Sequence, residues 1–304
     1  MSEDLAVHAR KLRRTFGAFV AVDDIDLEVP RGSIYGFLGP NGAGKTTTIR
    51  ILCGLLEPSS GAAIVDGIDV VKDAEGVKER IGYMSQKFAL YNDLTVDENI
   101  RFYGDVYLVP RKRVAARRAF ALHMAGLEGR EKALTQTLPV GIKQRLALGC
   151  AVLHEPRVLF LDEPTAGVDP LSRRAFWRLI HTMRQQGVTV FVTTHYMDEA
   201  ENCGTVAFIR AGRLVGLGSP RQLRERGDRG DLVRVRGVER EALQQNPRVR
   251  ALTPMGAAWH LRLRAAGEAD DLARELGVPV ERIAPSLEDV FLDACEGNAE
   301  EKQP

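Results

Sequence analysis

The segment GPNGAGKTT places glycines, a lysine and a threonine hydroxyl at the spacing G-x-x-x-x-G-K-T. Glycines let a loop curl so that consecutive backbone N–H groups point at phosphate oxygens. Lys45 adds a cation for the β- and γ-phosphates, and the Thr46 hydroxyl is a ligand for Mg²⁺. We therefore expect a phosphate site for a nucleoside triphosphate. Its lining residues are Gly39, Pro40, Asn41, Gly42, Ala43, Gly44, Lys45, Thr46 and Thr47.

Two adjacent carboxylates follow the apolar run RVLFL. Asp162 is expected to hold Mg²⁺, and Glu163, on the other side of the strand end, is expected to polarise the water that attacks the γ-phosphate. His195 ends the run VTVFVTTH and is interpreted as a donor to the γ-phosphate. Alone, such a pair is often the start of a loop, and such a histidine is often structural. Beside a phosphate loop, all three become catalytic candidates.

Short buried strands and helices must position these groups. Apolar runs rich in β-favouring residues predict strands, and 3.6-residue periodicity predicts helices between them, which favours an α/β fold with parallel strands. The segment 20–29 alternates apolar and polar residues and predicts an antiparallel edge sheet. The other predicted strands are 33–39, 157–162 and 188–195, and the predicted helices are 46–56, 141–153, 171–186 and 196–202.

Two further regions have patterns of their own. Residues 87–137 contain helical patterns only, beginning with a threonine cap, and are interpreted as a helical insertion. After about residue 225 the predicted order is β-α-β-β-α-β, a small split sheet-and-helix unit. Its strands are 231–236, 249–253, 258–264 and 280–284, and its helices are 239–245 and 268–276.

Composition sets the broad class of protein. The 304 residues are 44% hydrophobic and carry a net charge of +1, which gives no general attraction to nucleic acid. Residues 221–264 hold 11 arginines and residues 265–304 hold 11 acids, so the two stretches are able to complement each other. The four widely spaced cysteines suggest neither zinc nor disulfides and fit a reducing cytosol. No signal peptide or membrane span is expected.

Six motifs in one order give the sequence a family resemblance. The phosphate loop, YMSQ, LPVGIKQR, LFLDEP, AGVD and TTH together resemble the ATP-binding subunits of ABC transporters over roughly residues 5–225. The resemblance implies a P-loop NTPase cassette with a mixed sheet core, an antiparallel β subdomain and a helical insertion at about 87–155. We expect the cassette to span 1–225, a small α+β C-terminal domain 226–295, and a disordered tail 296–304.

The resemblance also assigns roles to single residues. Phe16 occupies the place of the aromatic that stacks on adenine, and Val22 that of the apolar residue near the ribose. Gln86 is similar to the glutamine that touches Mg²⁺ or the attacking water. Asp169 falls at the aspartate of the loop that crosses the dimer interface. The implied ligands are ATP and Mg²⁺, with Thr46, Gln86 and Asp162 around the metal.

One motif departs from the family pattern. In the family, a segment typically L-S-G-G-Q caps the γ-phosphate bound by the opposite subunit, so that ATP joins two copies. Here Pro139 and Val140 replace the serine and the first glycine, and Gly141 is kept. Proline removes a hydroxyl and an N–H but is tolerated at a helix start. Lys143 or Arg145 are candidates for compensation.

The resemblance is strongest to the exporter branch that moves drugs, lipids or polysaccharides, partly through the closing segment PSLEDVFL, which is otherwise a plain amphipathic helix capped by Ser286. It implies an ATPase that works as a dimer with itself or a related chain, against a separate membrane permease, on the cytoplasmic side of the membrane. Two alternatives stay open: an ABC-type ATPase acting on ribosomes or DNA, and a regulatory cassette with a degenerate signature. The sequence does not identify the cargo.

Overall fold

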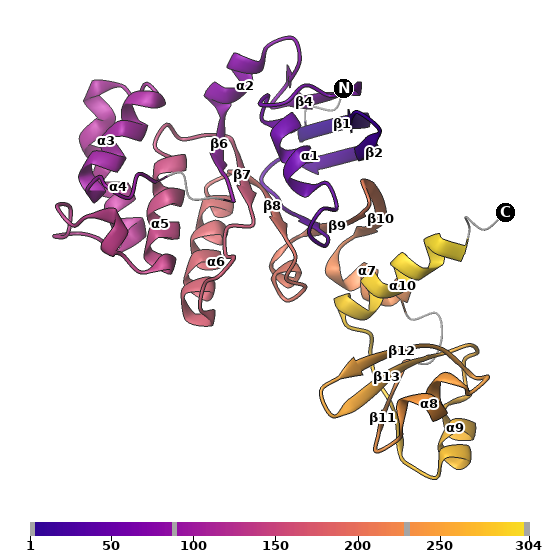
Figure 1. The fold of residues 1–304 in the computed structure, drawn as a ribbon. Coiled ribbons are helices and arrows are strands. Elements are labelled where there is room, and N and C mark those ends of the chain that lie inside the picture. Colours follow the sequence, from indigo (N-terminus) through magenta and orange to yellow (C-terminus); the bar gives the residue numbers. More distant parts are fainter. Residues whose placement is uncertain (1–3, 87–89, 228–231, 301–304) are drawn as a thin grey trace. The chain divides into compact units, whose positions relative to one another are not determined.

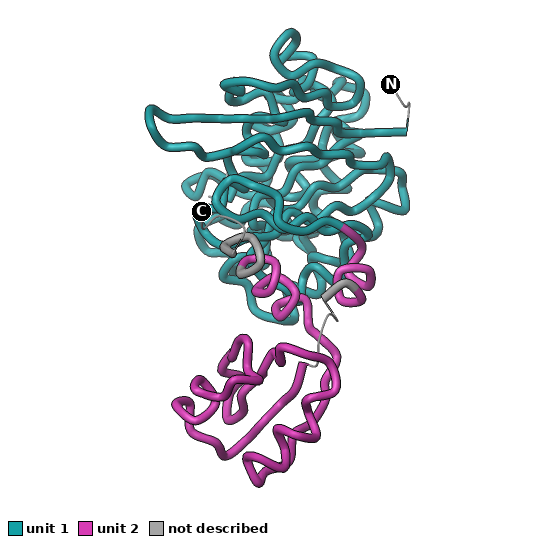
Figure 2. The backbone as a smooth tube through the Cα atoms, turned by 90° about the vertical axis from the view of Figure 1, so that its right-hand side faces the viewer, with its two compact units in different colours: residues 1–217 teal, residues 218–304 magenta. Residues whose placement is uncertain are grey.

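A computed structural model describes residues 4–86, 90–227 and 232–300 (Figure 1). The chain divides into two compact units, residues 1–217 and 218–304 (Figure 2). Every residue predicted to act on the nucleotide belongs to the first unit. Within the described ranges, no helix combines the length and the apolar character needed to cross a membrane.

A six-stranded sheet lies at the centre of the first unit. Its strands are β3 (Ile34–Leu38), β6 (Ile81–Met84), β7 (Val158–Asp162), β8 (Thr189–Thr194), β9 (Thr205–Arg210) and β10 (Arg213–Gly218). Their order is β10-β9-β3-β8-β7-β6, and the neighbours from β9 to β6 are parallel. Strands β3, β7 and β8 are buried at every residue, which explains their continuous apolar runs. The three strands predicted from those runs are confirmed, and their carboxyl ends meet at one edge.

An antiparallel sheet forms the second layer of this unit. It contains β1 (Leu5–Phe16), β2 (Phe19–Pro30), β4 (Ser60–Val65) and β5 (Ile68–Asp69) in the order β2-β1-β4-β5. Strand β2 pairs antiparallel with β1, which confirms the prediction for residues 20–29. The alternate residues of β1 and β2 that face inward join one apolar core with β3 and α1 (Lys45–Leu52).

The helices of the first unit largely follow the predicted pattern. They include α2 (Ala74–Arg80) and α6 (Pro170–Gln185), whereas α1 ends four residues earlier than expected. The predicted helix 196–202 is wrong over residues 196–198, and only a 3-10 turn, η2 (Glu199–Asn202), forms. The N–H of Tyr196 donates to the Thr194 hydroxyl instead, and this local bond turns the chain directly after β8.

The helical insertion consists of α3 (Val96–Val106), α4 (Arg111–Ala125), the turn η1 (Thr135–Thr137) and α5 (Val140–Ala151). Its predicted range of about 87–155 begins at residues 87–89, which lie outside the described residues. The predicted threonine cap is Thr95, whose hydroxyl accepts from the N–H of Glu98 while the Glu98 carboxylate accepts from the N–H of Thr95. This capping box begins α3.

The second unit is built on an antiparallel sheet. Its strands β11 (Leu232–Arg236), β12 (Val249–Met255), β13 (Ala258–Leu263) and β14 (Val280–Arg282) lie in the order β12-β13-β11-β14. Helices α8 (Arg240–Gln244) and α9 (Ala269–Leu276) contribute to its apolar core. The predicted order β-α-β-β-α-β is therefore present, between α7 (Pro220–Gly227) and α10 (Leu287–Glu300).

Charge pairing links the arginine-rich and acidic stretches of this unit. Arg262 pairs with Asp293 of α10, and Arg248 pairs with Glu275 of α9. The Ser286 hydroxyl accepts from the N–H of Asp289 and caps α10, as its sequence predicts. The helix runs to Glu300 and so overlaps the segment 296–304 that was expected to be a tail, of which 301–304 lie outside the described residues.

Candidate nucleotide site

The phosphate loop connects the end of β3 to the start of α1 through very close backbone contacts. A Cβ on Gly39 would lie 2.2 Å from the carbonyl oxygen of Ile209 in β9. A Cβ on Gly44 would lie 2.4 Å from the carbonyl oxygen of Ala21 in β2, and Gly44 has φ +106°. Only glycine fits at these two positions. The loop ends at the amino terminus of α1, whose unpaired N–H groups and dipole favour a phosphate.

Lys45 is buried at the base of this loop. Its Nζ donates to the carbonyls of Gly39 and Pro40, at 2.8 and 3.1 Å, and lies 3.0 Å from Oε1 of Glu163. The Lys45 side chain is only 4% exposed, and these three oxygens compensate its buried charge. The structure thus brings the predicted cation of the loop to the predicted base.

Asp162 ends β7 and is fully buried. Its Oδ1 accepts a 2.6 Å hydrogen bond from the hydroxyl of Thr193, and its buried Oδ2 has no hydrogen-bond partner among the described residues. Burial raises the pKa of Asp162 above its ordinary value, although the hydroxyls of Thr193 and Thr46 partly oppose this shift. A carboxylate oxygen held this way is suited to a cation.

Glu163 follows directly and is the centre of the site. Its φ is +49°, an uncommon conformation for a residue with a side chain, so its backbone is strained at this predicted catalytic position. Its N–H donates to both the carbonyl and the hydroxyl of Thr193, at 3.1 and 3.0 Å, which holds that conformation. As a result, the side chain turns away from Asp162 and toward Lys45.

Three predicted residues meet at the Glu163 carboxylate. Oε1 faces Lys45, while Oε2 lies 3.1 Å from Nε2 of Gln86 and 3.2 Å from Nδ1 of His195. These side chains come from α1 and from the ends of β6, β7 and β8, so the parallel strands bring together residues up to 150 positions apart. The predicted catalytic set, Lys45, Gln86, Glu163 and His195, is therefore one cluster.

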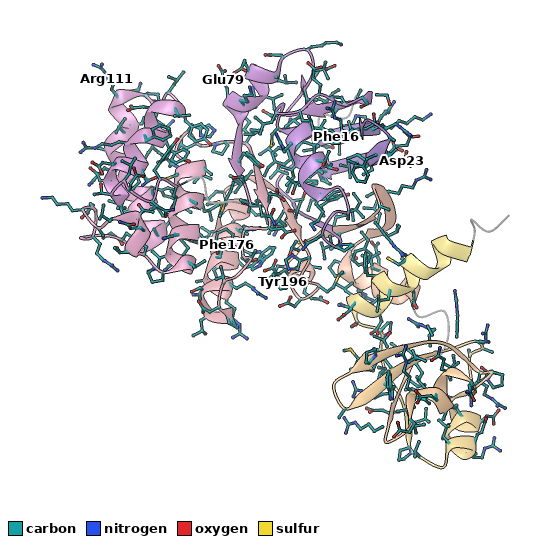
Figure 3. The ribbon with its side chains drawn as sticks, in the orientation of Figure 1. Phe16, Asp23, Glu79, Arg111, Phe176 and Tyr196 are labelled. Atoms are coloured by element: carbon teal, nitrogen blue, oxygen red, sulfur yellow. The ribbon has the colours of Figure 1, made fainter. Side chains whose placement is uncertain are left out.

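The two residues that are predicted to lie beside the adenine and the ribose differ in their accessibility. Phe16 lies at the end of the β1–β2 hairpin (Figure 3), with 47% of its surface exposed and the guanidinium carbon of Arg14 4.7 Å from its ring centroid. Val22 is 0% exposed and belongs to the apolar core. The structure therefore presents Phe16 to a ligand and does not present Val22, because Val22 is on the inward-facing side of β2.

The degenerate signature begins α5. Pro139 is the N-cap residue, and its carbonyl accepts from the N–H groups of Ile142 and Lys143, both at 3.0 Å. Pro139 and Val140 are exposed, whereas Gly141 is buried against α6, since a Cβ there would lie 2.6 Å from Ser172. An open helix amino terminus remains at this corner even without the serine.

The remaining residues of this corner have structural partners. Asp169 caps α6 by accepting from the N–H groups of Leu171 and Ser172, and hydrogen bonds from Ser172 hold its pKa below the ordinary value. Of the two suggested compensating cations, Lys143 donates to the carbonyl of Gln136 at 3.2 Å. The Nε of Arg145 is buried without a hydrogen-bond partner in the described parts of the chain. Lys143 lies in the first turn of α5, and its described contact is with η1, the turn that precedes this helix.

Sequence reasoning missed two residues that organise the site. Thr193 binds both Asp162 and the backbone of Glu163, and its position in TTH, one strand away from the carboxylates, was the available signal. Glu199 is 1% exposed and accepts from the hydroxyl of Thr165, and Arg173 approaches the same carboxylate at 3.4 Å. This second cluster connects the segment after Glu163 to the segment after His195.

The donor set fits a magnesium nucleotide. Mg²⁺ prefers oxygen ligands and keeps several waters, which it receives from few protein groups and from phosphates. Asp162 supplies a buried oxygen without a geometric hydrogen-bond partner in the described residues, and Thr46, exposed at the start of α1, is near enough for its hydroxyl to lower the pKa of that carboxyl. Gln86 lies at the same edge, next to Glu163. The loop, Lys45 and the amino terminus of α1 supply the groups that bind phosphate.

Comparison with known proteins agrees with this geometry. The family model described as "ABC transporter" matches residues 22–166. The probable multidrug ABC transporter ATP-binding protein YbhF of Escherichia coli is 46% identical over 221 residues, which are 73% of this chain and 38% of YbhF. The Nod factor export ATP-binding protein I of Cupriavidus metallidurans is 37% identical over 83% of this chain and 82% of that protein. The daunorubicin resistance ATP-binding protein DrrA3 of Streptomyces coeruleorubidus is 34% identical over 95% of this chain and 95% of that protein.

Solved structures show the same fold for the first unit. One is an ATP-binding subunit of an ABC transporter, with 28% identity and a TM-score of 0.66 over 73% of this chain and 92% of that chain. Another is cbiO1 from Clostridium perfringens, part of the ABC transporter complex cbiONQ, with 30% identity and a TM-score of 0.66 over 72% of this chain and 90% of that chain. The chain spans 38% of the length of YbhF, so it corresponds to one part of that relative.

Proposed function

This chain belongs to the ABC transporter family of ATP-binding subunits, and we propose that it is the ATP-hydrolysing motor subunit of an exporter. The observation that carries the proposal is the contact of Glu163 with Lys45, Gln86 and His195 at the ends of adjacent parallel strands. Such a cluster serves to bind a triphosphate and activate water beside it.

In this site each side chain has a defined role. The phosphate loop and Lys45 bind and orient the β- and γ-phosphates, and Glu163 accepts the proton of the attacking water. His195 and Gln86 hold Oε2 of Glu163 in place. Thr46, Gln86 and Asp162 would hold Mg²⁺, which when bound neutralises developing charge on the phosphates. Thr193 orients Asp162 and fixes the backbone of Glu163.

Dimer closure would complete the site from outside. Pro139 to Gly141 form an exposed helix amino terminus, which offers N–H groups to a phosphate bound by a second subunit. Asp169, at the start of the neighbouring helix α6, lies beside Gly141 through Ser172. The intact catalytic cluster favours an active ATPase over a regulatory cassette. The relatives are transporter subunits, so action on ribosomes or DNA is not favoured.

A groove between the core and the helical insertion is the proposed contact for a permease. It has a volume of about 720 Å³ and lies between Tyr83 on β6 and the α3–α4 connection, where Val106 is 56% and Leu108 82% exposed. Exposed apolar side chains around a groove mark a protein-binding surface. Because β6 leads to Gln86, a helix seated there would sense the state of the catalytic cluster.

Export is proposed from the relatives. Their names describe multidrug transport, Nod factor export and daunorubicin resistance. We infer that this chain drives outward movement of a drug-like or lipid-like compound that the permease selects, and that the chain works at the cytoplasmic face of the membrane.

Phosphate release by the purified chain, alone and with its permease in lipid vesicles, tests the proposal. We expect Mg²⁺-dependent ATP hydrolysis that Lys45→Met removes and that Lys72→Met, an exposed position, leaves unchanged. Hydrolysis that persists in Lys45→Met, or the lack of any hydrolysis by the wild-type chain with the permease, would contradict it.

A further inference from the structure

A chain of backbone hydrogen bonds joins the β1–β2 hairpin to the phosphate loop. The N–H of Asp23 in β2 donates to the carbonyl of Gly212 at 2.8 Å, and the N–H of Gly212 donates to the carbonyl of Ala43 at 3.0 Å. Gly212 lies in the turn between β9 and β10, and Ala43 lies in the phosphate loop. This turn therefore connects the strand that carries Asp23 to the loop that carries Lys45.

The carboxylate of Asp23 makes a second connection across the same elements. Nη1 of Arg13 in β1 donates to Oδ1 at 2.5 Å, and Nε of Arg213 in β10 donates to Oδ2 at 2.6 Å. The Asp23 side chain is 12% exposed, against 36% and 55% for the two arginines. One partly buried carboxylate thus clamps β1, β2 and β10 together.

The hairpin held by Asp23 also carries Phe16, the aromatic residue predicted to stack on adenine. Phe16 ends β1, three residues beyond Arg13, and Phe19 lies opposite it in β2 with 62% of its surface exposed. Arg14 lies over the Phe16 ring, and its Nη1 donates to the carbonyl of Glu57 at 2.8 Å. Figure 3 shows Phe16 and Asp23 in the same β1–β2 region. The position of the Phe16 ring relative to the phosphate loop therefore depends on how the hairpin is held.

Close backbone contacts make this arrangement rigid at the loop side. The carbonyl of Ala21, two residues before Asp23, would lie 2.4 Å from a Cβ on Gly44 and 3.1 Å from one on Gly212. Strand β2 consequently touches the phosphate loop and the β9–β10 turn directly. A shift of the hairpin would move these contacts together with the Asp23 clamp.

We propose that Asp23 is a positioning residue for nucleotide binding, because its ion pairs and the backbone bonds beside it hold the hairpin that carries Phe16 against the elements that carry the phosphate loop. The inference rests on the proposed ATP binding and adds a residue that touches neither base nor phosphate. Partly exposed ion pairs contribute little to folding stability. Preorganised spacing, in contrast, raises affinity by reducing the ordering that binding requires.

The test compares a ligand that has a base with one that lacks it. Dissociation constants of the full chain for ATP and for inorganic tripolyphosphate, both with Mg²⁺, are measured by titration calorimetry. We expect Asp23→Asn to weaken ATP binding about fivefold and to leave tripolyphosphate binding within about twofold. Asp24→Asn is the matched control, since its side chain is 61% exposed and approaches Arg13 only at 3.8 Å.

A double-variant comparison shows whether Asp23 acts through the ring. We expect Asp23→Asn added to Phe16→Ala to weaken ATP binding by no more than about twofold beyond Phe16→Ala alone. Arg213→Ala breaks the clamp from its more exposed side. It should weaken ATP binding in the same way as Asp23→Asn, and it takes the place of that variant if Asp23→Asn fails to fold.

Three results would overturn the inference. They are equal weakening of ATP and tripolyphosphate binding by Asp23→Asn, full additivity with Phe16→Ala, and unchanged ATP binding in both Asp23→Asn and Arg213→Ala. In each of these the wild-type chain still binds ATP, so the proposed function stands. A wild-type chain that binds neither ligand overturns the proposed function and this inference together.

Discussion

The Nζ of Lys45 lies 3.0 Å from Oε1 of Glu163, and both groups are almost fully buried. The other two donors of Lys45 bond to carbonyls of its own loop. An ammonium group has three donors, so a phosphate bound in the loop must replace Glu163 or one of these carbonyls at Lys45. Release of Oε1 would free that oxygen for water. In the proposed mechanism, this ion pair would link phosphate binding to the release of the Glu163 carboxylate.

Thr193 is expected to control the metal requirement. Thr193→Val removes the hydroxyl that binds Asp162 and the N–H of Glu163 while keeping the size of the side chain. We expect the Mg²⁺ concentration for half-maximal hydrolysis to rise about tenfold, as for other residues that orient a metal ligand. Thr189→Val is the control, because it is equally buried at the opposite end of β8. Equal effects of the two variants would refute this role.

Restoring a serine at the signature should stabilise the chain. Pro139→Ser adds a side-chain acceptor at the N-cap of α5, where the proline makes no side-chain cap bond, and is expected to add about 0.5–1 kcal/mol to the free energy of unfolding. Chemical denaturation measures it. Pro139→Ala also removes the proline ring but adds no hydroxyl, so it shows the effect of losing the ring alone. If Pro139→Ala is as stable as Pro139→Ser, the capping explanation fails.

Asp66 should make stability depend on acid pH. Burial by itself raises the pKa of this fully buried carboxylate, but hydrogen bonds from Arg31 and Arg80 outweigh burial and lower it. The stabilisation is therefore present above the unfolded pKa of about 4 and is lost as the pH falls through the lower folded value. Asp66→Asn should reduce the free energy of unfolding by about 1–3 kcal/mol at pH 7 and by less at pH 3. A pH-independent difference in denaturation midpoint would contradict this assignment.

A change in the groove should reduce permease binding without changing ATP hydrolysis by the isolated chain. Leu108→Glu places a charge at an apolar side chain that is 82% exposed, so it should leave folding and the ATPase rate of the isolated chain unchanged. It should lower co-purification with the permease at least tenfold. Met255→Glu in the second unit, at a side chain that is 39% exposed, serves as control. Normal permease binding by Leu108→Glu would rule out this contact.

The sequence predicts the parts of the site that depend on local patterns, such as apolar runs, the ends of strands and helix caps. Strands β3, β7 and β8 are recognisable because burial on both faces makes them continuous apolar runs, and parallel strands bring their carboxyl ends to one edge. The meeting of the phosphate loop, Asp162, Glu163 and His195 follows from that geometry. The capping residues Thr95 and Ser286 follow from local hydrogen bonding.

Other features depend on contacts that periodicity does not encode. The partner of Asp23 is Arg213, 190 positions away, and no local pattern links them. The resemblance assigns Val22 to the ribose, whereas its side chain is fully buried in the apolar core, next to Ala21, which is also buried. The strained φ of Glu163 arises from the two hydrogen bonds to Thr193 in the next strand, which only the pairing of β7 and β8 creates.

The most direct test of the account is whether Glu163→Gln holds ATP between two subunits without hydrolysing it. Sedimentation of this variant with Mg²⁺ and ATP should show a dimer that is absent with ADP, and phosphate release should fall at least about 100-fold relative to the wild-type chain. Glu28→Gln, at an exposed carboxylate, should behave as wild type. Hydrolysis by Glu163→Gln at the wild-type rate, or a variant that stays monomeric with ATP in the presence of its permease, would contradict the central claim.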